Sequence, residues 1–479
     1  MLKRFFVFNL ILLLTACSPH SVRFFNKPNI DPPVRFSNIE ADTNSTKTEV
    51  KWWENFNDKT LNKLILAALD NNLNLQAAWE RLRQAQEQAV IAGSELYPQL
   101  SVSGTGSRSR FVNPELQGAL SVDSQNTIYF NDFAIRNGLS FEVDIWKRVL
   151  SGKRAQEYRA EAARADAENT ALLLTGAIAN SWFNLNKQEK LTKLISEQID
   201  SNKVLLELAE LRFSLGKGTA LDVFQQRQQL QSVKAEAPQI KTDYESFKNQ
   251  LAVLLGKTLN SVENMKIAGN LPALPKFPGF ISPAELIDYR PDLLAYRARL
   301  QAQEYDLAKA VAERFPRLAL GLNYDFKASQ VEDVLDRQQG SIFGNLLLPL
   351  IDGGRRRAVV RLNESQVNEQ IKLFDNQFII ALADVETAIS KEKSQAELVK
   401  LLKQQLVYAK ATLDESQNRY RHGLTEYIQV VLALQSLQSL ERRYVNESAN
   451  LLNARVKLHL AIGGRWQDDS SPKSGEVKL

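Results

Sequence analysis

The stretch that decides the fold reads Arg-Leu-Ala-Leu-Gly-Leu-Asn-Tyr-Asp-Phe, residues 317–326. Its even-numbered positions are all apolar, and its odd-numbered positions are small, polar or charged. Such alternation predicts a β-strand, because successive side chains of a strand point to opposite faces. A strand of an outer-membrane barrel has this pattern over about ten residues. A half-buried strand of a soluble sheet has it too, so the pattern alone leaves the surroundings open.

A second stretch, residues 133–145, repeats the pattern with apolar side chains at the odd-numbered positions and one polar exception. Glycine-rich segments lie beside both stretches, at residues 100–106 and 342–344. We therefore predict four strands, arranged as two hairpins within residues 99–146 and 317–351.

The first residues predict export from the cytoplasm. Lys3 and Arg4 precede an apolar run and then small residues, which is typical of a signal peptide over residues 1–16. The run ends in Leu-Thr-Ala-Cys, which looks like the lipobox of bacterial lipoproteins, with Cys17 lipidated. No other cysteine occurs, so Cys17 has no disulfide partner. The alternative is an ordinary signal peptide with a chance cysteine. Residues 17–54 are polar and proline-spotted, and we expect them to form a lipid-anchored tether.

The composition excludes a helical membrane protein and a nucleic-acid-binding protein. Of 479 residues, 44% are hydrophobic and 24% charged, and after the signal no stretch reaches the roughly 18 apolar residues of a spanning helix. The net charge of +5 falls to 5 − 2 = +3 without Lys3 and Arg4, which is too small for nucleic-acid binding. A chain of this kind can cross a membrane only as a closed barrel. Together with the export signal, this favours lipid as the surroundings of the strands.

The chain is an internal duplication. Residues 208–256 match residues 415–463 at a constant offset of 207, and earlier parts match at an offset of 218. The duplication divides the mature chain into a first repeat at residues 55–265, a proline-rich linker at 266–281, a second repeat at 282–470 and a C-terminal tail at 471–479. Each repeat is predicted to begin with one helix, at about 58–96 and 283–314, before its strand hairpin.

Two long helices are predicted after each strand hairpin. No proline interrupts residues 115–237 or 350–471, and apolar residues recur there every three or four positions, as in coiled coils. Gly216 and Gly423 are expected to end the first long helix of each pair in a left-handed turn and to start the return helix. The fold class is therefore mainly helical with a smaller β part.

The number of strands predicts the oligomer. Four strands cannot close a barrel, since the smallest known barrels have about eight strands, and open sheet edges are not tolerated in lipid. Three chains would supply 3 × 4 = 12 strands, so we expect a homotrimer.

In this order of features the chain resembles the TolC-like outer-membrane factor family of tripartite efflux systems, and in particular its lipidated branch. The residues that carry the resemblance are the lipobox, Trp52-Trp53 with Phe56 and Leu61, Tyr97-Pro98, residues 140–144, residues 349–355 and residues 419–423. The resemblance implies a twelve-stranded outer-membrane barrel continuous with a long helical periplasmic tunnel. It also implies a passive exit duct that is served by a periplasmic membrane-fusion adaptor and an inner-membrane transporter. Ser18 in place of Asp would favour the outer membrane for the lipid anchor.

The resemblance also implies that an adaptor contacts the turns between the long helices. The implicated residues are Arg212, Gly216, Arg419, Tyr420 and Gly423. The alternative for both glycines is helix capping alone.

A gate is expected just beyond these turns. Asp222 and Glu426 could point into the lumen as rings of carboxylates that favour cations. Family members often have a second Asp where this chain has Leu432, so an apolar constriction is an open alternative. A plain surface carboxylate is the alternative for Asp222.

Basic residues lie where the strands become helices: Lys147, Arg148, Arg355, Arg356 and Arg357. Positive charge at a helix start opposes the helix dipole, so we expect these side chains to contact phosphates of outer-membrane lipid. The alternative is ordinary solubilising charge. Asp144 and Asp352 are expected to cap the helices that follow.

The sequence predicts neither an enzyme nor a cofactor or metal site. Gly256-Lys257-Thr258 resembles the end of a phosphate-binding loop, but Leu251 stands where that loop needs glycine. The alternative to a channel is a coiled-coil periplasmic lipoprotein, either an adaptor or a structural spacer. Such a protein would lack the two strand hairpins.

Overall fold

The computed structural model describes residues 19–37, 51–112, 127–262, 267–278 and 282–464. The chain forms two compact units, and each draws on both repeats. The first unit takes its described residues from Met1–Asn26, Leu82–Ala162 and Tyr296–Phe374. The second takes its described residues from Lys27–Arg81, Ala163–Ala295 and Asp375–Leu479. The signal peptide, Cys17 and the tail at 471–479 lie outside the described residues.

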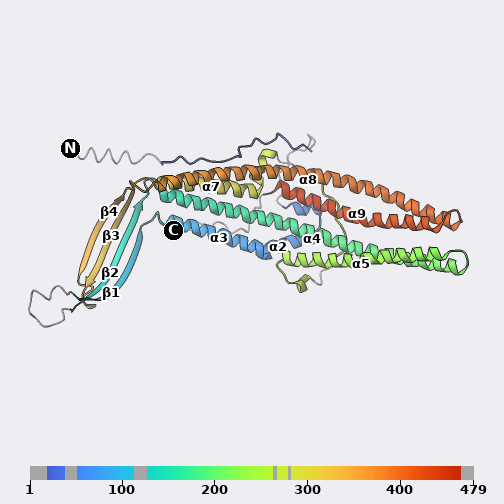
Figure 1. Ribbon diagram of the computed structural model, residues 1–479, viewed down its shortest axis with the longest axis horizontal. Helices are drawn as coiled ribbons and strands as arrows, with labels where there is room; N and C mark the ends of the chain where they lie inside the picture. Colours follow the sequence, from blue (N-terminus) through green and yellow to red (C-terminus); the bar gives the residue numbers. More distant parts are fainter. Residues whose placement is uncertain (1–18, 38–50, 113–126, 263–266, 279–281, 465–479) are drawn as a thin grey trace, which may run out of the picture. The chain divides into compact units, whose positions relative to one another are not determined.

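A four-stranded antiparallel sheet lies in the first unit, with the strands in the order β1-β2-β3-β4 (Figure 1). Its strands are β1 (Gln99–Val112), β2 (Thr127–Val143), β3 (Arg317–Ala328) and β4 (Gln338–Leu347). Each repeat supplies one hairpin, and β2 pairs with β3 across the duplication, with Leu139 opposite Leu322. The predicted strands are thus confirmed, and β1 and β4 are the edges of the sheet in one chain.

The long helices come in two pairs. The first pair is α4 (Arg148–Ser214) with α5 (Ala220–Leu254), and the second is α8 (Arg355–Arg421) with α9 (Tyr427–Ile462). Helices α4 and α8 have 67 residues each, as expected of proline-free segments. The predicted apolar stripes are largely buried, with Phe378 and Ile389 on α8 inaccessible to solvent.

The prediction of one opening helix per repeat was wrong, because both helices are interrupted. In the first repeat, α2 (Lys59–Asn71) stops at Asn72, whose side chain accepts a hydrogen bond from Leu75 N at 3.0 Å and so starts α3 (Leu73–Ser94). In the second repeat, the short elements η4 (Pro283–Glu285) and α6 (Leu286–Tyr289) precede α7 (Pro291–Ala312). Arg290 is extended there, because the proline that follows disfavours the helical conformation.

The main hydrophobic core lies in the second unit. The 3₁₀ helix η1 (Trp52–Phe56) and α2 pack their apolar side chains onto the middle of α4 and the ends of α5 and α9. The fully buried side chains include Trp53, Leu61, Ile65, Ile178, Phe183, Leu251 and Val456. Asp58 fixes this contact, since it caps α2 and also accepts a hydrogen bond from Trp182 Nε1 at 2.7 Å. A second short 3₁₀ helix, η3 (Leu259–Val262), follows α5.

Among the described residues, no helix is both long enough and apolar enough to span a membrane.

Candidate functional site

The two helix-hairpin turns have the same backbone structure. Gly216 and Gly423 have φ values of 71° and 72°, the left-handed region that glycine adopts without strain. Two hydrogen bonds close each turn as a Schellman motif. They are Gly216 N to Phe213 O (3.0 Å), Lys217 N to Arg212 O (2.8 Å), Gly423 N to Tyr420 O (3.0 Å) and Leu424 N to Arg419 O (2.9 Å). The predicted left-handed turns are confirmed, and capping fully accounts for the backbone of both glycines.

Side chains from the two repeats meet just before these turns. The Arg212 guanidinium lies over the ring of Tyr420, 4.7 Å from its centroid, in a cation–π contact. The Tyr420 ring also packs on Tyr427 of α9, with centroids 5.1 Å apart. Partial burial raises the pKa of the Tyr420 phenol, and the positive charge of Arg212 opposes this rise. Two predicted tip residues, Arg212 and Tyr420, are thus in direct contact. Gly216, Gly423 and Arg419 shape the turns around them.

A buried polar chain starts at Tyr427 and lies wholly within the second unit. The Tyr427 hydroxyl donates to Gln226 Oε1 of α5 at 2.9 Å, and Gln226 Nε2 donates to Asn202 Oδ1 of α4 at 3.0 Å. Burial raises the pKa of the Tyr427 phenol, and nearby Tyr420 and Asp222 add to the rise. Gln226 and Asn202 are fully buried. These hydrogen bonds were not predicted from the sequence, although Gln226 stands at helical spacing between Val223 and Leu230 and interrupts an otherwise apolar stripe.

Asp222, one of the predicted gate residues, has a structural role at the start of α5. Its backbone N–H donates to Thr219 Oγ1 at 3.2 Å, and its Oδ2 accepts from Thr219 N at 3.0 Å, which makes a reciprocal capping box. Glu426 is the N-cap residue of α9 and so corresponds to Thr219 rather than to Asp222; it is exposed and makes no side-chain cap. Leu432 is 50% exposed although its neighbours Val431 and Ala433 are buried. The predicted alternative was an apolar constriction at Leu432. The side chain of Leu432 is half exposed in a single chain, so it is available for such a contact.

The corners between strand and helix are capped as predicted. Asp144 accepts hydrogen bonds from Val149 N at 3.0 Å and from Leu150 N at 2.8 Å. Asp352 accepts from Gly354 N at 3.1 Å and from Arg356 N at 3.2 Å. These carboxylates offset the positive charge that follows them at each helix start.

The basic residues at the corners fall into two groups. Arg148 makes a bidentate ion pair with Glu142, with both N–O distances at 2.9 Å, and Arg356 pairs with Asp352 at 3.0 Å. Their charges are already balanced within the chain, and this favours a structural role for both. Lys147, Arg355 and Arg357 are exposed.

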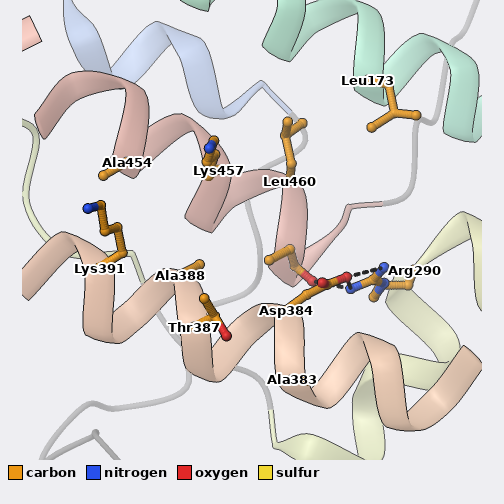
Figure 2. A pocket seen from close by; sticks show the side chains of 11 residues that line it. Leu173, Arg290, Ala383, Asp384, Thr387, Ala388, Lys391, Ala454, Lys457 and Leu460 are labelled. Carbon is orange, nitrogen blue, oxygen red and sulfur yellow. Dashed lines mark hydrogen bonds and ion pairs between the residues drawn. The ribbon is translucent and has the colours of Figure 1, made fainter. Parts of the chain in front are cut away.

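A cavity of about 540 Å³ lies in the second unit between α8 and α9, with Leu173 of α4 also on its wall (Figure 2). Arg290 and Asp384 face each other at one end, with Nη1 3.2 Å from Oδ2, and Lys391 and Lys457 lie toward the other. Arg290 also pairs with Asp292 at 2.7 Å and donates to Ala461 O at 3.2 Å. Burial alone would raise the pKa of the Asp292 carboxyl, but the hydrogen bonds from Arg290 outweigh it and hold the pKa below its usual range. Periodicity could not reveal this network, because it joins residues that are far apart in sequence.

The chain is similar to known proteins over both repeats. The model of the family described as "Outer membrane efflux protein" matches residues 64–257 and 283–464, most of both repeats. The pyoverdine export outer membrane protein OpmQ of Pseudomonas putida is 27% identical over 96% of this chain and 97% of that protein. Nodulation protein T of Rhizobium leguminosarum bv. trifolii is 25% identical over 95% of this chain and 96% of its own length.

Solved structures share the fold at low sequence identity. The outer-membrane channel OprN has a TM-score of 0.85 at 22% identity, with 94% of this chain and 100% of that chain covered. The outer membrane channel CmeC of Campylobacter jejuni has a TM-score of 0.84 at 22% identity, with 94% of this chain and 96% of that chain covered.

Proposed function

Because the chain belongs to the outer membrane efflux protein family, we propose that it is one subunit of a homotrimeric channel that gives an inner-membrane pump an exit duct across the outer membrane. The observation that carries this proposal is the sheet. It has one apolar face and two open edges, at β1 and β4. Unpaired backbone groups are not tolerated in lipid, so β4 of one chain must pair with β1 of the next. Three chains then close twelve strands. The alternative, a coiled-coil spacer or adaptor, is expected to lack such a sheet.

The names of the relatives support export as the role. OpmQ is a pyoverdine export outer membrane protein, and CmeC and OprN are outer-membrane channels. In this chain the duct is passive, and the transport energy comes from the pump. The helical part extends into the periplasm.

The helix-hairpin turns are the proposed docking site of a periplasmic membrane-fusion adaptor. Arg212 and Tyr420 join the two turns of one chain, and exposed apolar side chains, Phe213 and Leu424 among them, surround them. An apolar surface rimmed by basic residues is typical of a protein-binding site. Gly216, Arg419 and Gly423 belong to this site because they set the path of the backbone there.

The lipid anchor at Cys17 remains a prediction, since this residue lies outside the described part of the chain. It is supported by the way the next residues are held in the first unit. Glu304 of α7 is fully buried and accepts hydrogen bonds from the backbone of Arg23 at 3.1 Å and from its guanidinium at 3.2 Å. It is also bonded to His20 at 3.0 Å. The chain is therefore fixed three residues after Cys17, in the unit that holds the sheet, which suits an acyl chain inserted beside it.

Contact with lipid phosphates is proposed for the exposed basic residues Lys147, Arg355 and Arg357. Arg148 and Arg356 lie beside these residues and are proposed to contribute to the same lipid-facing positive surface, although each is also paired with a carboxylate of its own chain. The repeat, linker and tail boundaries predicted from the duplication are likewise retained as a proposal.

Native mass spectrometry of the detergent-solubilised protein tests the central claim. Three chains per particle are expected, together with ion conductance in planar bilayers. A stable monomer that retains its β-sheet circular dichroism would refute a shared barrel. Lipidation is tested separately, because Cys17→Ser should abolish the incorporation of labelled palmitate without dissociating the trimer.

A further inference from the structure

The two faces of the sheet differ in chemistry. Residues directly opposite each other on neighbouring strands share a face, so the register defines rows of side chains across the sheet. One face has the rows Ser101-Gly138-Asn323-Ser341 and Ser103-Arg136-Asp325-Gln339. The other face carries Leu139, Leu322 and Ile342 in one row. In a barrel set in lipid, the first face would line the aqueous lumen.

Phe343 is an exception on this polar face. It stands directly opposite Gly321, in the row next to that of Asn323 and Ser341, and its own strand neighbours on this face are Ser341 and Asn345. The far end of its ring lies over Gly321, because a Cβ added to that glycine would come within 2.2 Å of Phe343 Cζ and 2.7 Å of both Cε atoms. The ring covers Gly321, yet 45% of Phe343 stays exposed. The end of the ring therefore packs on the strand, while part of the side chain is open in one chain.

Packing alone does not explain why an aromatic side chain stands here. Two other strand glycines in the sheet are covered in the same manner, Gly106 by Phe133 and Gly340 by Tyr324. Both of those rings lie on the apolar face. In a barrel this face contacts lipid, so an aromatic ring there is not exposed to water. Phe343 instead leaves an apolar ring on a wall of hydroxyl, amide and charged groups.

We propose that Phe343, held over Gly321, is a lumen-facing aromatic platform on which exported solutes with a planar aromatic group stack during passage. This inference rests on the proposed trimeric channel, in which three such platforms would lie at one level of the barrel. A glycine is required at position 321, since any side chain there would displace the Phe343 ring from the strand. Ring stacking with offset geometry strengthens a contact beyond simple burial.

The orientation is tested with two cysteine variants at adjacent positions. Phe343→Cys should react with a charged, water-soluble methanethiosulfonate reagent in proteoliposomes, and the added charge should reduce conductance. Ile342→Cys is the matched control, because its side chain points to the apolar face although it is 84% exposed in one chain. Labelling at Ile342→Cys without labelling at Phe343→Cys would overturn the proposal.

The binding role is tested by channel block. Ethidium, a planar aromatic cation, is added to single channels in bilayers, and tetrabutylammonium serves as the non-aromatic cation. Phe343→Leu should shorten ethidium block by about two- to tenfold and leave tetrabutylammonium block unchanged, whereas Phe343→Tyr, which keeps the ring, should retain the long block. Equal ethidium block times in Phe343→Leu and in the unmodified channel would overturn the platform. The conductance of the unmodified channel reports on the proposed function separately.

Discussion

Arg455 of α9 and Glu392 of α8 form a buried ion pair, with 2.8 Å between Arg455 Nε and Glu392 Oε2. The two residues are 1% and 3% exposed. Arg455 Nη1 also donates to the carbonyl oxygens of Pro275 at 2.7 Å and Lys276 at 2.6 Å. One guanidinium therefore joins two long helices of the second repeat to the linker that connects the repeats.

Removing this cation should destabilise the second unit strongly. Arg455→Met leaves Glu392 charged and buried without a partner, which typically costs about 3–5 kcal/mol. It also leaves two linker carbonyls without their donor. We expect a large drop in the thermal unfolding midpoint, followed by circular dichroism at 222 nm in detergent.

The matched control is an exposed pair between α4 and α5. Arg227 lies 2.7 Å from Glu210, with side-chain exposures of 55% and 42%. Arg227→Met should change stability by less than about 1 kcal/mol, because exposed pairs contribute little. If the two variants unfold at the same temperature, the Arg455 pair does not hold the linker in place.

Gly256 should not tolerate alanine. It has φ 65°, and an added Cβ would come within 2.2 Å of the backbone oxygen of Asn71. Gly256→Ala must therefore displace the end of α2 from α5, in addition to the roughly 1–2 kcal/mol cost of a left-handed residue that is not glycine. Gly216→Ala is the control, since φ is 71° there and nothing lies within 4 Å. Comparable unfolding midpoints for the two variants would show that α2 moves freely at this contact.

The sequence predicted the elements that depend on local chemistry. Alternation in residues 317–326 predicted β3, and the paired glycines predicted both helix-hairpin turns, because only the local backbone decides these features. The family and the fold of one chain are confirmed. The prediction of one helix over residues 283–314 was wrong at Arg290, because Pro291 disfavours the helical conformation of the residue before it.

The contacts between distant residues could not be predicted in this way. Arg290 meets Asp384, and Arg455 meets the linker, only because long helices cross at particular registers. Periodicity shows which face of a helix is buried but not which residue lies opposite it. Phe343 illustrates the same limit, since both its face and its contact with Gly321 follow only from the strand register.

His459 should make the second unit sensitive to acid. Burial lowers the pKa of its imidazole to about 3, and the neighbouring Arg455 adds to this effect. The ring is stacked on Trp52 with centroids 5.2 Å apart. The pKa in the unfolded chain is about 6.5, so above that pH neither state binds the proton and stability is unaffected. As the pH falls from 6.5 toward 3, only the unfolded state binds it, and stability falls by up to about 1.4 kcal/mol per pH unit.

Unfolding midpoints measured between pH 7 and pH 4 test this. His459→Phe should reduce the decline with acid, because an apolar ring keeps the stacking without a titrating group. His422→Phe, in the exposed turn before α9, should leave the decline unchanged. Parallel curves for the unmodified chain and His459→Phe would show that this histidine is not the acid-sensitive group.

Asp222, at the start of α5, is the charged candidate for the gate. In a trimer, Asp222 would bring three carboxylates toward one axis, and these would attract cations in a salt-dependent manner. Asp222→Asn removes the charge but keeps an oxygen that can accept from Thr219 N, so the capping box at 3.0 Å survives the change. It should therefore lower the cation preference of the channel in planar bilayers without loss of stability. Leu432→Asp would instead place three repelling charges at the uncovered apolar position on α9 and raise conductance. Asp200→Asn removes one exposed carboxylate per chain from α4, away from the turns, and serves as the control. If Asp222→Asn and Asp200→Asn leave the same ion selectivity, then Asp222 acts only as a helix cap, and the constriction is apolar or lies elsewhere.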